Sequence, residues 1–182
     1  MRKLCLLFLL IGTYCYAGER KYTVDSPDGK IQLAIIQTDA GELTYQLSVK
    51  RKQVIDASAL GFKTEDGLTF PFRGWKMGKV TRNKVNSVWK PLWGKRAVVP
   101  DKYNEMKLSF VNEAKSSDAL EVVARAYNEG VAFRYVSPQD AGSALELTTF
   151  NFAGDYTAWF YNGERHNIGP ERLTETDGEG CG

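Results

Sequence analysis

Cysteine and histidine are scarce in this 182-residue sequence, which contains three cysteines and one histidine. A zinc site needs several such ligands and a disulfide framework needs paired cysteines, so neither is expected. An excess of one charge is also missing, since 24 lysines and arginines accompany 22 aspartates and glutamates. Without a basic excess, nucleic acid is not an expected partner. The hydrophobic fraction of 43% is that of a globular domain rather than a disordered chain.

Long hydrophobic runs are absent as well, and the longest apolar run lies in the first 17 residues. Two basic residues precede the run Leu4–Ile11, and small residues follow it. This run is too short to span a bilayer, which takes about 20 residues. Residues 1–17 are therefore predicted to be a signal peptide cleaved after Ala17, with export to the periplasm or cell surface and no membrane span. Cleavage of a lipoprotein signal at Cys15 is the alternative.

The rest of the chain shows short runs in which apolar and polar residues alternate with period two. The runs are Ile31–Ile36, Leu43–Val49, Met106–Phe110, Leu120–Ala126, Val131–Val136, Leu145–Phe152 and Tyr156–Tyr161. Turn-forming residues separate several of them, as at Ser26–Gly29 and Asn128–Gly130. No segment keeps a helical apolar stripe for three turns. The pattern predicts an all-β fold, an antiparallel β-sandwich over residues 18–161.

Arg125 and Arg134 lie on the two predicted strands that flank the turn at Asn128–Gly130. Arginines on such strands are often solvated or paired across the sheet, because the long apolar stem packs while the guanidinium stays polar. The alternative is that one of them supports a loop that carries a carboxylate.

The C-terminal segment, residues 162–182, differs from the sandwich in its composition. It contains few apolar residues besides Ile168 and Leu173, and it is rich in glycine and acidic residues. It is predicted to be a loop or linker that another body must hold. A chain with this ending suggests a truncated or excised domain.

Three motifs in this order give the sequence a family resemblance. They are Ser26–Lys30 before a strand, Val88–Gly94 followed by Tyr103–Met106, and Arg125–Tyr135. Together they resemble the N-terminal domain of glycoside hydrolase family 97, and the resemblance covers about Tyr22–Asp177. That family includes exported α-glucosidases and α-galactosidases typical of glycan-degrading Bacteroidetes.

The resemblance implies a β-sandwich of the galactose-mutarotase type, a super-sandwich that packs against a catalytic (β/α)8 barrel. Such a barrel needs about 250 residues, so this chain does not contain it. The chain is therefore expected to hold no catalytic residue of its own. Its partners would be the barrel and, through the full-length enzyme, an α-linked oligosaccharide. The choice between α-glucoside and α-galactoside, and between inversion and retention, would be made by the barrel.

The resemblance also implies that a glutamate after the last strand helps to hold a calcium ion near the sugar. Glu171 is the first candidate and Glu164 the second, and a solvated loop carboxylate is the alternative for each. Ca²⁺ takes six to eight oxygen ligands, so binding to this chain alone would be weak or absent. His166 and Asn167 are candidates for hydrogen bonds to a sugar hydroxyl, although a lone loop histidine is usually solvated.

Tryptophans offer a second hypothesis, a free-standing carbohydrate-binding module without a hydrolase partner. Trp89, Trp93 or Trp159 would then be the platform on which a pyranose ring stacks. For Trp89 and Trp93, packing as core or interface anchors, at a structural corner beside Pro91, is favoured over direct contact with a sugar. A third hypothesis is a remnant or interaction protein that has no sugar-binding role.

Overall fold

The structure is a computed structural model that describes residues 19–65, 67, 69–71, 75–113, 119–137, 142–161 and 167–175. Within these residues every regular element is a β-strand, and no helix there could cross a membrane. The strands are β1 (Arg20–Asp25), β2 (Ile31–Gln37), β3 (Leu43–Val49), β4 (Lys52–Leu60), β5 (Phe62–Thr64), β6 (Thr69–Phe70), β7 (Trp75–Trp89), β8 (Val99–Asn112), β9 (Ala119–Tyr127), β10 (Val131–Val136), β11 (Ala144–Glu146), β12 (Thr157–Tyr161) and β13 (Asn167–Arg172).

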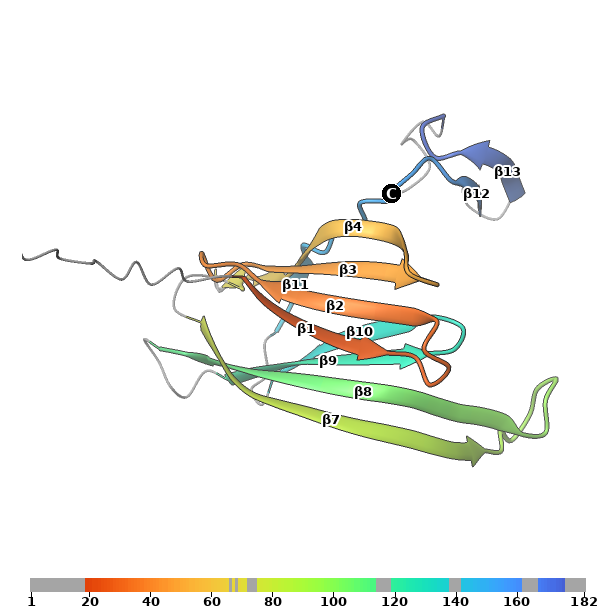
Figure 1. Ribbon diagram of the computed structural model, residues 1–182, viewed down its shortest axis with the longest axis horizontal. Coiled ribbons are helices and arrows are strands. Elements are labelled where there is room, and N and C mark those ends of the chain that lie inside the picture. Colours follow the sequence, from red (N-terminus) through yellow and green to blue (C-terminus); the bar gives the residue numbers. More distant parts are fainter. Residues whose placement is uncertain are drawn as a thin grey trace, which may run out of the picture.

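Two four-stranded antiparallel sheets form the body of the molecule (Figure 1). One sheet has the order β1-β2-β3-β4 and the other has the order β10-β9-β8-β7. A small sheet, β11-β5-β6, and the separate hairpin β12-β13 complete the described strands. The prediction of an all-β antiparallel sandwich is confirmed.

The core lies between the two main sheets and follows the alternation of the sequence. Leu33 and Ile35 of β2 are fully buried, as are Met106, Leu108 and Phe110 of β8. Because side chains alternate between the two faces of a strand, these spacings place one face of each sheet against the other. The apolar surface removed from water on these two faces is the main source of stability.

Phe70 fills the end of the core where the small sheet meets the main sheets. Its ring contacts four others, with centroid distances of 5.7 Å to Phe62, 5.3 Å to Trp75, 5.2 Å to Phe110 and 5.9 Å to Tyr135. Among these neighbours, burial of the Tyr135 hydroxyl raises its pKa to about 12. The aromatic rings therefore join five strands, β5, β6, β7, β8 and β10.

The predicted strand Leu145–Phe152 is regular only at its start, where Ala144–Glu146 form β11. Beyond it the chain runs along β4 with irregular hydrogen bonds. Thr149 N–H donates to Ala59 O at 3.1 Å, and the Thr149 hydroxyl accepts from Ala59 N–H at 2.8 Å. Side-chain oxygens replace part of the backbone ladder here, so this segment covers the edge of β4 without forming a standard strand.

The longest hairpin, β7-β8, extends beyond the other strands as an arm (Figure 1). Its outer half has no opposing sheet, and the connection between Trp89 and Val99 is exposed. Trp93 is 88% exposed and Trp89 is 54% exposed. The described residues therefore do not enclose these two tryptophans in a core, and their predicted role as interface anchors stays a prediction.

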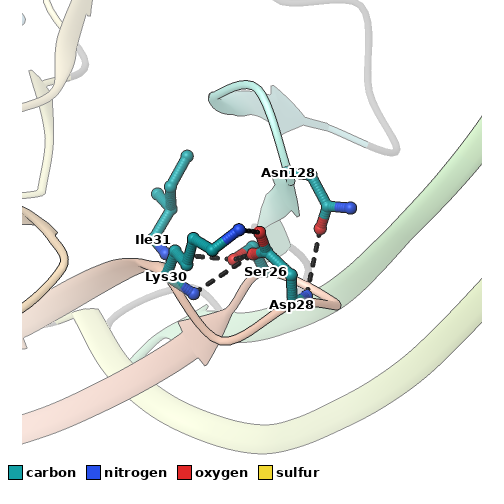
Figure 2. Close-up of polar contacts among 5 residues, drawn as sticks. All are labelled: Ser26, Asp28, Lys30, Ile31 and Asn128. Carbon is teal, nitrogen blue, oxygen red and sulfur yellow. Dashed lines mark hydrogen bonds and ion pairs between the residues drawn. The ribbon is translucent and has the colours of Figure 1, made fainter.

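The turn between β1 and β2 is tied to the turn between β9 and β10 (Figure 2). Asp28 N–H donates to Asn128 Oδ1 at 3.0 Å, and Asp28 Oδ1 accepts from the Ser26 hydroxyl at 2.6 Å. Lys30 Nζ lies 2.9 Å from Asp28 Oδ2. The hydrogen bond from Ser26, supported by Lys30, lowers the pKa of Asp28 from 3.8 to about 2. The carboxylate thus shapes the β1-β2 turn, and the backbone N–H of the same residue joins this turn to the other sheet through Asn128.

The predicted loop over 162–182 is wrong for Asn167–Arg172, which form β13 and pair with β12. The sequence signal is weak because this segment contains Gly169 and Pro170 and shows no alternation of apolar residues. Backbone pairing with a preceding strand, rather than burial of a face, accounts for this strand.

Candidate functional site

The hairpin β12-β13 carries the described candidate residues and lies apart from the two main sheets (Figure 1). Its register shifts between Ala158 and Phe160, so that Trp159 lies at a β-bulge. Gly169 of β13 lies opposite this bulge with φ of +121°, and a Cβ on it would lie 2.6 Å from Ala158 O. Only glycine fits this approach without strain. Bulges often re-aim a side chain, and Trp159 is 68% exposed.

The open end of this hairpin is fastened by Asp155 and Arg172. Arg172 Nε donates to Asp155 Oδ2, and Thr174 N–H donates to Asp155 Oδ1 at 3.1 Å. The hydrogen bond from Arg172 lowers the pKa of Asp155. Leu173 N–H also donates to Tyr156 O at 2.9 Å. These contacts fix where β13 ends.

Glu171 is half-buried and pairs with Ala158 across the hairpin. Asn167 pairs with Tyr161 through the backbone, and its side chain lies outside the described residues, as do Glu164 and His166. The described structure therefore brings three candidate residues, Trp159, Asn167 and Glu171, onto one hairpin.

A calcium site needs more carboxylate ligands than the described residues of this hairpin offer. Among the residues that the structure describes, no group of three or more His, Cys, Asp or Glu could hold a metal ion. One carboxylate supplies at most two of the six to eight oxygens that Ca²⁺ takes. The described residues of this chain thus do not form a calcium site on their own, and Glu171 fits only as one ligand among others.

A polar groove that was not predicted from the sequence lies between β1 and the β7-β8 hairpin, with a volume of about 620 Å³. Asp25 and Ser26 line one side, and Arg82, Lys84 and Asn104 line the other. Asn104 Nδ2 donates to Asp25 O at 2.7 Å, and Arg82 Nη2 donates to Thr23 O at 3.2 Å. The two walls lie far apart in the sequence, and local patterns contain no signal for their approach.

The two main sheets and the hairpin β12-β13 define an all-β sandwich domain. Its described residues include no group of His, Cys, Asp or Glu side chains that could hold a metal ion. The chain belongs to the glycosyl-hydrolase 97 N-terminal family, whose model matches residues 24–178. The predicted family resemblance is thereby confirmed.

Two curated relatives and one solved structure describe the similarity. The chain is 22% identical to a retaining alpha-galactosidase of Bacteroides thetaiotaomicron over 96% of its own length and 28% of the relative. It is 29% identical to a probable retaining alpha-galactosidase of Streptomyces bingchenggensis, over 88% of this chain and 26% of the relative. A glycoside hydrolase family 97 enzyme from Pseudoalteromonas sp. strain K8, in complex with panose, superimposes with a TM-score of 0.67. It shares 34% identity over 78% of this chain and 22% of that one. The chain thus spans about a quarter of the length of these proteins.

Proposed function

We propose that this chain is the non-catalytic β-sandwich of a family 97 α-glycosidase, which buttresses a (β/α)8 barrel and supplies Glu171 to a calcium-bearing active site. The observation that carries the proposal is the hairpin β12-β13, which presents Glu171 apart from the two main sheets (Figure 1). A carboxylate held in this way, with no metal cluster around it among the described residues, suits a ligand offered to a neighbouring body.

The position of Glu171 also supports a role in which this chain is not catalytic by itself. Glycoside hydrolysis generally takes two carboxyl groups held on opposite sides of the scissile bond. Glu171 lies on a two-stranded hairpin, without the rigid surrounding layer that positions a catalytic group. In the proposed enzyme the barrel provides the acid and the base or nucleophile, while Trp159, His166 and Asn167 lie toward the α-linked oligosaccharide.

The proposed role is tested first with the chain alone. The purified chain should show no turnover of nitrophenyl α-glucoside or α-galactoside, with or without calcium. Calcium-dependent turnover by this polypeptide would contradict the proposal directly.

A chimaera tests the role of Glu171. Residues 24–178 would replace the matching part of the Pseudoalteromonas enzyme, with which the chain shares its fold. The chimaera should be active with calcium, and Glu171→Gln should raise the calcium concentration for half-maximal activity by about tenfold or more, as loss of a metal-site group typically does. Glu175→Gln is the matched control, because Glu175 is exposed and follows β13. Equal effects of the two substitutions would remove Glu171 from the metal site.

A free-standing carbohydrate-binding module is the second candidate, and the exposure of Trp159 favours it. An indole ring that is 68% exposed offers its face to a pyranose ring. Calorimetry with an α-linked oligosaccharide should then show binding by the chain alone that is lost in Trp159→Ala and kept in Trp93→Ala. Failure of the chain to bind, together with an active chimaera, would decide for the first candidate.

We also infer export after cleavage of residues 1–17. Mass spectrometry of the product secreted by a bacterial host should give Gly18 as the first residue. A product in the cytoplasm that retains Met1 would contradict export.

A further inference from the structure

The connection at the end of the β7-β8 hairpin, residues 88–98, is here called the arm tip. Its large apolar side chains face solvent in the described chain: Leu92 is fully exposed, Trp93 is 88% exposed and Val88 is 64% exposed. Scattered apolar residues on a surface are ordinary, but several large ones within one short segment mark an interaction site.

The arm tip is also basic. Residues 88–98 include three cations, Lys90, Lys95 and Arg96, and no acidic residue. Arg82, midway along β7, lies in the groove beside β1 and donates to Thr23 O. A partner for this surface must therefore combine an apolar centre with an acidic rim.

The chemistry of the arm tip favours a protein partner over a neutral glycan. Sugar hydroxyls are bound by carboxylates, which accept, and by amide side chains, which both donate and accept, and residues 88–98 contain neither type. Tryptophan and arginine beside aliphatic residues are instead typical of the energetic centres of protein interfaces. A second copy of this chain would bring two basic tips together, which like-charge repulsion opposes.

The position of the arm indicates which protein the partner is. The arm tip and the hairpin β12-β13 reach toward the same end of the long axis of the molecule (Figure 1). The relatives extend to about four times the matched length, and the match is to their N-terminal part. A body that receives Glu171 at this end can therefore contact the arm as well.

We propose that the arm tip, through Leu92, Trp93 and the cations Lys95 and Arg96, docks on an acidic-rimmed apolar surface of the catalytic part of a family 97 enzyme. This inference rests on the proposed function, since it names a second contact with the same partner. This interface would hold the catalytic part of the enzyme in a fixed position relative to the hairpin β12-β13.

Radical footprinting of Trp93 tests the docking. In the chain alone the indole should be oxidised rapidly. In the chimaera its oxidation rate should fall by about fivefold or more, because residues at an interface centre are excluded from water. Lys95→Glu with Arg96→Glu should restore rapid oxidation in the chimaera and leave the urea midpoint of the isolated chain unchanged. Lys63→Glu with Lys79→Glu makes the same charge change away from the arm tip and should keep the protection.

The outcomes separate this inference from the proposed function. A chimaera that is active and calcium-dependent but leaves Trp93 fully reactive overturns the docking and keeps the function. A folded chimaera without activity overturns both. If the chimaera does not fold, the footprint is taken on the chain mixed with the remainder of the Pseudoalteromonas enzyme, and failure to protect Trp93 there rejects the docking.

Two results with the chain alone would also overturn the docking. One is protection of Trp93 by an α-linked oligosaccharide, which would make the arm tip a sugar site. The other is a dimer in sedimentation that dissociates on Leu92→Ser with Trp93→Ser, which would make it a contact between copies. Conservative Leu92→Met with Trp93→Phe should retain protection of the aromatic ring in the chimaera if an apolar interface is the cause.

Discussion

Arg125 and Glu105 lie directly opposite each other on β9 and β8, and Arg125 Nε donates to Glu105 Oε2 at 2.8 Å. Glu105 alternates with the core residue Met106, so its side chain lies on the outer face of the sheet, yet it is only 6% exposed. The Arg125 guanidinium also lies 4.3 Å from the centroid of the Tyr103 ring. Arginine and tyrosine thus cover a carboxylate on a face that is otherwise solvated. For Arg125, pairing across the sheet is confirmed.

Replacing Arg125 by leucine should destabilise the fold by about 2 kcal/mol, because Glu105 would keep its burial and lose the closer of its two cationic partners. The other partner, Lys107 Nζ, lies 3.7 Å from Glu105 Oε1. Urea unfolding of the variant measures this difference. Arg134→Leu is the control, since Arg134 is exposed on the adjacent strand β10. Equal unfolding midpoints for the two variants would show that the ion pair contributes nothing.

Asp28 should make the stability depend on pH in the acid range. Its pKa in the folded chain is about 2, below the ordinary 3.8, through the hydrogen bond from Ser26 and the contacts with Lys30. The ionised form therefore stabilises the fold above about pH 4, and this contribution is lost as the pH falls toward 2. Melting temperatures between pH 2 and 6 should show a deficit for Asp28→Asn that shrinks at low pH. Asp39 is an exposed turn residue, so the melting temperature of Asp39→Asn should change with pH as that of the unsubstituted chain does.

Gly169→Ala should open the hairpin β12-β13 without unfolding the sandwich. An added Cβ would meet Ala158 O at 2.6 Å, and φ of +121° is strained for any other residue. Hydrogen exchange should accelerate in β12 and β13 while amides in β2 and β8 keep their protection. Gly154→Ala is the control, because its Cβ would meet nothing closer than 3.7 Å. An unchanged exchange pattern in Gly169→Ala would contradict the close packing described.

Phe70→Ala should cost about 4 kcal/mol, since it removes a fully buried ring that contacts four aromatic neighbours. Phe150→Ala should cost less than about 1 kcal/mol, because that ring is 61% exposed. Denaturant unfolding monitored by tryptophan fluorescence gives both values. A small loss of unfolding free energy in Phe70→Ala would show that the packing around this ring contributes little to stability.

The sequence predicted the sandwich because each buried strand has an apolar face, as in β2 and β9. It missed β7 as a strand, since the outer half of that strand is solvated on both faces and shows no alternation. The resemblance indicated Glu171, and the hypothesis of a carbohydrate-binding module indicated Trp159. The structure brings both residues onto one hairpin. The groove beside Arg82 could not be predicted, because β1 and β7 meet only through tertiary packing.

The hydrogen bond from Asp28 to Asn128 joins residues that are 100 positions apart in the chain. Closing so long a loop is slow, and a fold dominated by such distant pairings has a high contact order. The first sheet can form its hairpins early, but its outermost turn stays unfastened until β9 and β10 have arrived. In kinetic refolding this contact should therefore belong to a late step, and Asn128→Ala, which removes the accepting Oδ1, should speed unfolding more than it slows refolding.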